Sequence, residues 1–105
     1  MIAWGASGCG PTIYPSFDSP EPAARNAAIV RAAGDQDQKA VADLVRMLES
    51  DDPATRLLAI VTLEGLTGER FGYEHGASEL ERRKSIEKWE AYLKKTKELE
   101  GIQQP

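Results

Sequence analysis

The stretch that decides the fold is SDDPATRLLAIVTL, residues 50–63. Two acidic residues followed by Pro53 are typical of a helix start, because proline at the first helical position gives up only an N–H without a helical partner. Acidic side chains at this point also interact favourably with the positive, N-terminal end of the helix dipole. The apolar residues that follow Arg56 wrap most of the circumference, so we predict a buried, central helix over residues 53–66 that stops at Thr67-Gly68.

A similar string lies 31 residues earlier, SPEPAARNAAIV at residues 19–30, against SDDPATRLLAIV at residues 50–61. Ser, Pro, Ala, Arg, Ala, Ile and Val coincide in the alignment. The repeat predicts a first helix over residues 20–33 with Gly34 as its stop, and the pairs Glu21/Arg25 and Asp52/Arg56 have helical i,i+4 spacing. Repeats of this period are typical of helical solenoids.

Two more helices follow from the rest of the chain. An apolar stripe at spacings of 3, 4 and 3 predicts a helix over residues 38–49; its members are Val41, Leu44, Val45 and Leu48. Ser78 with Glu81 forms a capping box, which predicts a helix over residues 79–98 that buries Trp89 and packs on the 53–66 helix. We therefore expect an all-α fold of two helical hairpins.

The strings DDPATRLLAIVTL (residues 51–63) and AVADLVRML (residues 40–48) together resemble HEAT repeats. Members of that family commonly show an acidic-acidic-proline turn, an arginine three residues later, and then an alanine and an apolar run. The resemblance covers residues 19–68, and the first unit is richer in alanine than the second. It implies an α-solenoid stack with a protein-binding or scaffolding role, and it implies no catalytic residue.

The first nineteen residues have no helical or alternating period and are rich in glycine and proline. Within them Ala6-Ser7-Gly8-Cys9 resembles the lipobox of bacterial lipoproteins, a family in which the chain is cut before a cysteine that is then lipidated. The alternative is a free cysteine in a flexible terminus. We therefore divide the chain into a targeting remnant or tether (1–19), a HEAT-like helical domain (20–99) and a frayed tail (100–105).

The composition excludes several classes of protein. Seventeen acidic residues against thirteen basic ones give a net charge of −4, which argues against a nucleic-acid binder. One cysteine allows no internal disulfide. His75 is the single histidine, whereas a zinc site needs three or four ligands, and the sequence holds no glycine-rich phosphate loop. We predict a protein that is not an enzyme and that has no metal or cofactor.

We place the partner-binding site at a groove between the hairpins. Arginines and aromatic residues gather there, the combination enriched in binding hot spots: Arg25, Arg56, Arg70, Phe71, Tyr73 and His75. Two alternatives stay open. The loop aromatics can instead plug the end of the helical core, and the arginines of the two repeat units can be occupied by their acidic neighbours.

Three functions remain. The first is a non-catalytic protein-interaction or scaffolding module, held at the cell envelope through a lipid on Cys9 or free in the cytoplasm. The second is an accessory or regulatory subunit that positions an enzyme or its substrate. The third is a nucleic-acid-binding helical repeat, against which the acidic balance counts.

Overall fold

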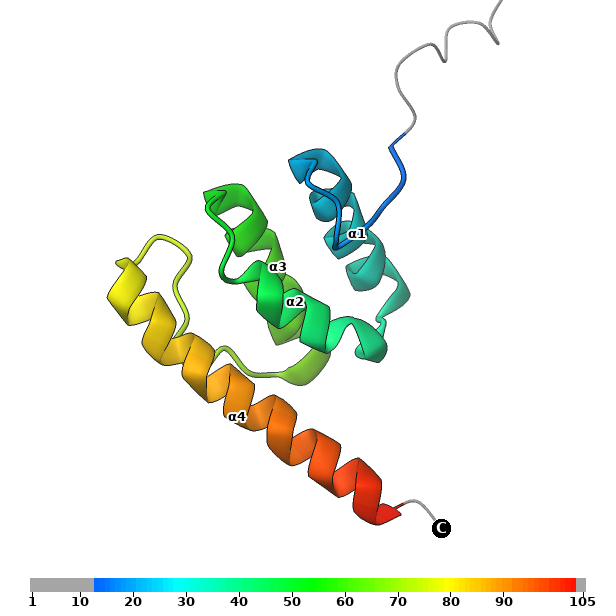
Figure 1. The fold of residues 1–105 in the computed structure, drawn as a ribbon, viewed down its shortest axis with the longest axis vertical. Coiled ribbons are helices and arrows are strands. Elements are labelled where there is room, and N and C mark those ends of the chain that lie inside the picture. Colours follow the sequence, from blue (N-terminus) through cyan, green and yellow to red (C-terminus); the bar gives the residue numbers. More distant parts are fainter. Residues whose placement is uncertain (1–12, 104–105) are drawn as a thin grey trace, which may run out of the picture.

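The computed structural model describes residues 13–103, and this part of the chain is helical with no strand (Figure 1). The elements, in chain order, are α1 (Pro22–Asp35), a short 3-10 helix η2 (Gln38–Ala40), α2 (Val41–Met47), α3 (Pro53–Thr67) and α4 (Glu79–Gln103). The prediction of an all-α fold is therefore confirmed for these residues.

The helices of the two repeat units pack side by side. α1 lies against α3, and α2 packs on α3 (Figure 1). α4 contacts α2 more extensively than it contacts α3. This differs from the expected pairing of α4 with the 53–66 helix. The reason is the segment of residues 68–78, whose aromatic side chains pack against α4 and into the core.

The ends of α1 and α3 differ in how they are made. α3 stops where predicted, with Gly68 in the left-handed region at φ 80°. The prediction that Gly34 stops the first helix is wrong, because α1 continues to Asp35 and Gln36 takes the left-handed conformation at φ 48°. The N–H of Asp37 then donates to the carbonyl of Ala32 at 3.0 Å, which closes a Schellman-type end.

The other two helices also depart from their predicted bounds. The predicted helix over residues 38–49 is a 3-10 turn followed by α2, and the Asp37 carboxylate caps the turn by accepting from the N–H of Lys39. Ser78 caps α4 as predicted, since its hydroxyl accepts from the N–H of Glu81 at 3.2 Å. The tail predicted to fray from residue 100 is helical as far as Gln103.

The core lies between α1, α2, α3 and the first half of α4. Its largest fully buried side chains are Trp89, Tyr73, Ile29, Leu44, Leu48, Ile60, Leu63 and Thr55. We had expected α3 to be buried around most of its circumference. It is central, but one side of it is exposed. Leu57 is 40% exposed and Val61 54% exposed.

The folded unit begins before residue 20, where we had placed the end of the tether. The N–H of Ser16 donates to the Ala24 carbonyl at 3.1 Å, Phe17 packs against the core, and Asp18 pairs with Arg46 at 3.3 Å. These contacts cover the flank of α1 that α3 does not reach. The predicted lipidation site, Cys9, lies outside the described residues.

Candidate interaction groove

The two repeat units have the same turn before their helices. The Ser19 hydroxyl accepts from the N–H of Glu21 at 3.0 Å, and the Ser50 hydroxyl accepts from the N–H of Asp52 at 3.1 Å. One turn into each helix, an arginine reaches back to the serine carbonyl: Arg25 Nη1 donates to Ser19 at 2.9 Å, and Arg56 Nη1 donates to Ser50 at 2.8 Å. The sequence repeat is thus also a structural repeat.

The expected i,i+4 ion pairs of these arginines with Glu21 and Asp52 are absent from the described residues. Each guanidinium instead donates to a backbone carbonyl six residues earlier. The Asp52 carboxylate caps α3, accepting from the N–H of Ala54 at 3.0 Å and from the Thr55 hydroxyl at 3.1 Å. Capping uses the carboxylate that would otherwise have paired.

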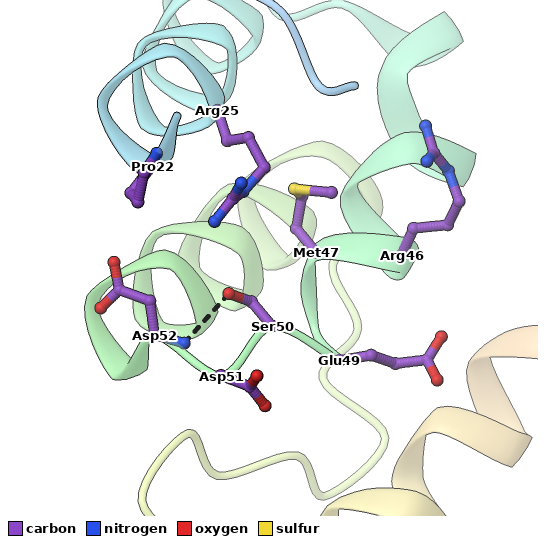
Figure 2. A pocket seen from close by; sticks show the side chains of 8 residues that line it. All are labelled: Pro22, Arg25, Arg46, Met47, Glu49, Ser50, Asp51 and Asp52. Carbon is purple, nitrogen blue, oxygen red and sulfur yellow. Dashed lines mark hydrogen bonds between the residues drawn. The ribbon is translucent and has the colours of Figure 1, made fainter. Parts of the chain in front are cut away.

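Between the start of α1 and the turn that joins α2 to α3 lies a groove of about 570 Å³, which we call the turn groove (Figure 2). Its lining comes from both units: Pro22, Arg25, Arg46, Met47, Glu49, Ser50, Asp51 and Asp52. Arg25 extends from α1 into this space (Figure 2). The turn groove therefore contains one predicted site residue, together with the turn that the repeat defines.

Arg46 forms the charged rim of the turn groove. It pairs with Asp43 one turn earlier and with Asp18 at 3.3 Å. The hydrogen bond that Arg46 donates to the Asp43 carboxylate raises the pKa of Arg46 above its ordinary value, so this cation stays charged at any working pH. With two arginines and three carboxylates in its lining, the turn groove carries a net charge of −1.

Arg56 was predicted to bind a partner and lies buried instead, at 8% exposure. Its Nε donates to the carbonyl of His75 at 3.0 Å, in addition to the Ser50 bond. The guanidinium thus ties the turn before α3 to the loop before α4. Because Nε and Nη1 of Arg56 both donate to backbone carbonyls, this side chain holds the turn and the loop in place and does not face a partner. The His75 side chain is half-buried.

The two aromatic residues of the predicted site pack inward. Tyr73 is fully buried and its hydroxyl donates to the Leu48 carbonyl at 2.6 Å; burial raises the pKa of this phenol. Phe71 contacts Trp89 edge to face, with ring centroids 4.8 Å apart. Arg70 pairs with Glu64 at 3.0 Å, and its carbonyl accepts from the indole of Trp89 at 3.1 Å. The core-plugging alternative is thus the correct one for these aromatics.

Two of these loop residues adopt the left-handed backbone. Phe71 has φ 54° and Gly72 has φ 74°. A bulky residue such as Phe71 seldom adopts this conformation, and its ring is held by Trp89 and by Tyr92, whose centroid is 5.7 Å away. The packing of the ring offsets the local cost of the turn, which supports a structural role for this part of the loop.

The sequence analysis identified only Arg25 among the residues that line the turn groove. Met47 is the last residue of α2, Glu49 and Asp51 lie on the turn between α2 and α3, and none of the three stood out by residue type. The only signal that could have found them was the repeat itself, because the serine and arginine that coincide at an offset of 31 mark the edge on which the groove lies.

Searches of protein-family models, curated proteins and solved structures find no match to this chain. Within residues 13–103 no three His, Cys, Asp or Glu side chains are grouped as a metal site requires. None of the helices in the same range is long and apolar enough to cross a bilayer.

Proposed function

We propose that this protein is a non-catalytic protein-interaction module, built as a short two-unit stack of HEAT type, and that a partner binds at the turn groove. The observation that carries the proposal is the structural equivalence of the turns at Ser19–Arg25 and Ser50–Arg56, held side by side with a groove between them. Helical repeats typically bind partners on surfaces that successive units present together.

The chemistry of the turn groove favours a protein partner. Arginine, methionine and exposed carboxylates lie together there, so both apolar and charged contacts are available. The net negative lining argues against a phosphate backbone as the ligand. An accessory role beside an enzyme uses the same surface, and it differs from a scaffolding role only in the identity of the partner.

Charge reversal at Asp51 provides a selective test. Asp51 lines the turn groove, is exposed, and makes no side-chain hydrogen bond or ion pair within residues 13–103, so Asp51→Lys should leave the fold intact. Glu98→Lys on the exposed side of α4 is the matched control, with the same change of charge. We expect a tagged protein to recover its partner from the native cells as wild type and as Glu98→Lys, and to lose it as Asp51→Lys.

The outcome that contradicts the proposal is an identical set of recovered proteins with all three chains. A titration against duplex DNA tests the nucleic-acid alternative independently. A phosphate binder would lose affinity steeply as salt rises. We expect no binding at physiological salt with either wild type or Asp51→Lys.

The lipid anchor is a separate proposal that rests on Ala6-Ser7-Gly8-Cys9 alone. It would hold the module at the surface of the cell envelope and leave the helical domain free to bind. Mass spectrometry of the protein made in its own host, from the full upstream reading frame, should show a mature chain that starts at a lipidated Cys9. An unmodified terminus at Met1 on a cytosolic protein would exclude the anchor.

A further inference from the structure

A second groove lies on a different side of the fold, between η2 and the start of α2 on one wall and the C-terminal half of α4 on the other. It encloses about 510 Å³, and we call it the α2–α4 groove. In Figure 1, α4 continues past the start of α2, and no other helix of residues 13–103 runs beside its last turns.

The floor of the α2–α4 groove is apolar. It is formed by Val41 and Ala42 of α2 and by Tyr92 and Leu93 of α4, and the last two side chains are only half-buried. Thr96 continues the α4 wall, with its hydroxyl turned back to the Tyr92 carbonyl at 2.9 Å. The Thr96 hydroxyl is therefore already satisfied, and the floor offers mainly apolar contact.

The rims of the groove are cationic. Lys39 stands on the η2 wall and Lys97 on the α4 wall, and one carboxylate, Glu100, lies at the far end. Neither lysine takes part in an ion pair within residues 13–103. In a chain with a net charge of −4, this groove thus has the opposite sign from the molecule as a whole.

From this complementarity we infer that the α2–α4 groove binds an acidic amphipathic helix of a protein partner. An apolar floor between two walls matches the helix-in-groove mode of recognition, in which one helix face supplies apolar side chains at i, i+3/i+4 and i+7. Carboxylates on both flanks of that face would meet Lys39 and Lys97. The inference does not depend on the turn groove, because the two grooves share no lining residue.

The probe is a synthetic, fluorescein-labelled peptide designed as an amphipathic helix, with leucines on one face and glutamates along both edges. Its partner probe keeps the leucines and replaces the glutamates with lysines. Fluorescence anisotropy measures the binding of each peptide to the full chain. We expect the acidic peptide to bind about tenfold more tightly than the basic one, with an affinity that falls as salt rises.

A pair of double variants locates the binding. Lys39→Glu with Lys97→Glu reverses both rims and should weaken the acidic peptide about tenfold. Lys88→Glu with Lys95→Glu is the matched control, because these lysines are exposed on α4, do not line the groove, and give the same change in net charge. The control should change the affinity by less than about twofold.

Each other result overturns the inference. Equal weakening by both double variants would mean unspecific attraction between charges. Equal binding of both peptides would mean that the lysines on the rims do not discriminate between acidic and basic helices. The absence of binding would mean that the groove does not accept a helix. Binding of phosphatidylserine vesicles instead of the peptide, with the same dependence on Lys39 and Lys97, would identify a lipid surface as the occupant.

Discussion

The helices α1 and α3 begin with the same turn yet contribute differently to the fold. Arg25 and Arg56 make equivalent bonds, but Arg25 is half-buried whereas Arg56 is buried and makes a second bond, to His75. Two turns further on, Ala32 of α1 occupies the position that Leu63 occupies in α3. The larger side chain adds burial worth about 2 kcal/mol.

The difference comes from the neighbours of each helix. α3 has α1 on one flank, α2 on the other, and the loop of residues 69–77 near its N-terminal end. α1 packs on α3, and its other flank is covered only by the short segment around Phe17. A local motif thus sets the geometry of each turn. The number of elements packed around the helix determines how much the stability of the fold depends on that turn.

The largest effect is expected at Trp89 of α4. Its ring is fully buried, stacks edge to face on Phe71 and Tyr92, and donates to the Arg70 carbonyl. Trp89→Ala should lower the free energy of unfolding by about 3–5 kcal/mol. Urea denaturation followed by far-UV circular dichroism measures this, and a loss under about 1 kcal/mol would show that the ring does not close the core.

The equivalent isoleucines test the comparison directly. Ile29 of α1 and Ile60 of α3 occupy the same position of the repeat, and both are fully buried. We expect Ile60→Ala to cost about 4 kcal/mol and Ile29→Ala about 2–3 kcal/mol, because a cavity beside the thinly covered α1 can collapse more readily. Denaturant unfolding of both variants decides, and equal losses would mean that the two helices are equally supported.

The equivalent arginines sharpen the same contrast. Arg56→Ala leaves the carbonyls of Ser50 and His75 without their donor, so it should cost about 2–4 kcal/mol, against about 1 kcal/mol for Arg25→Ala. Hydrogen exchange should speed up across residues 72–77 in Arg56→Ala and stay unchanged there in Arg25→Ala. The same exchange pattern in both variants would show that Arg56 does not hold the loop.

A smaller effect than at Arg56 is expected at Tyr73. Tyr73→Phe removes the bond to the Leu48 carbonyl and should cost about 1–3 kcal/mol near neutral pH. Burial raises the pKa of Tyr73, so the folded state favours the neutral phenol. The contribution of the Tyr73 phenol to stability is complete below its pKa in the unfolded chain, about 10. This contribution is lost as the pH rises through the pKa of Tyr73 in the folded protein.

The stability difference between wild type and Tyr73→Phe should therefore shrink at alkaline pH. Urea unfolding of both chains at about pH 8 and about pH 11 measures this difference. The two chains differ at this one side chain, so the contributions of all other groups cancel in the comparison. A difference that stays constant across this range would mean that the hydroxyl is not buried in the folded protein.

The candidate site was predictable only where local pattern determines geometry. The repeat located the two serine-arginine turns, and Arg25 does line a groove. The loop from Arg70 to His75 was assigned to a partner because arginine and aromatic side chains serve binding and packing equally well. Whether Phe71 and Tyr73 face inward depends on α4 and on the Leu48 carbonyl, which lie far from them along the chain.

The sequence by itself determined the helices, most of their starts and the turn that the two units share. Proline, capping side chains and apolar periodicity act within a few residues of the chain, so these features need no knowledge of the fold. The tertiary structure alone decided that α4 packs on α2, that Arg56 is buried while Arg25 is not, and that Leu57 and Val61 stay exposed. Burial depends on which distant segments come together, and the same residue type is stable in either environment when its polar atoms find partners.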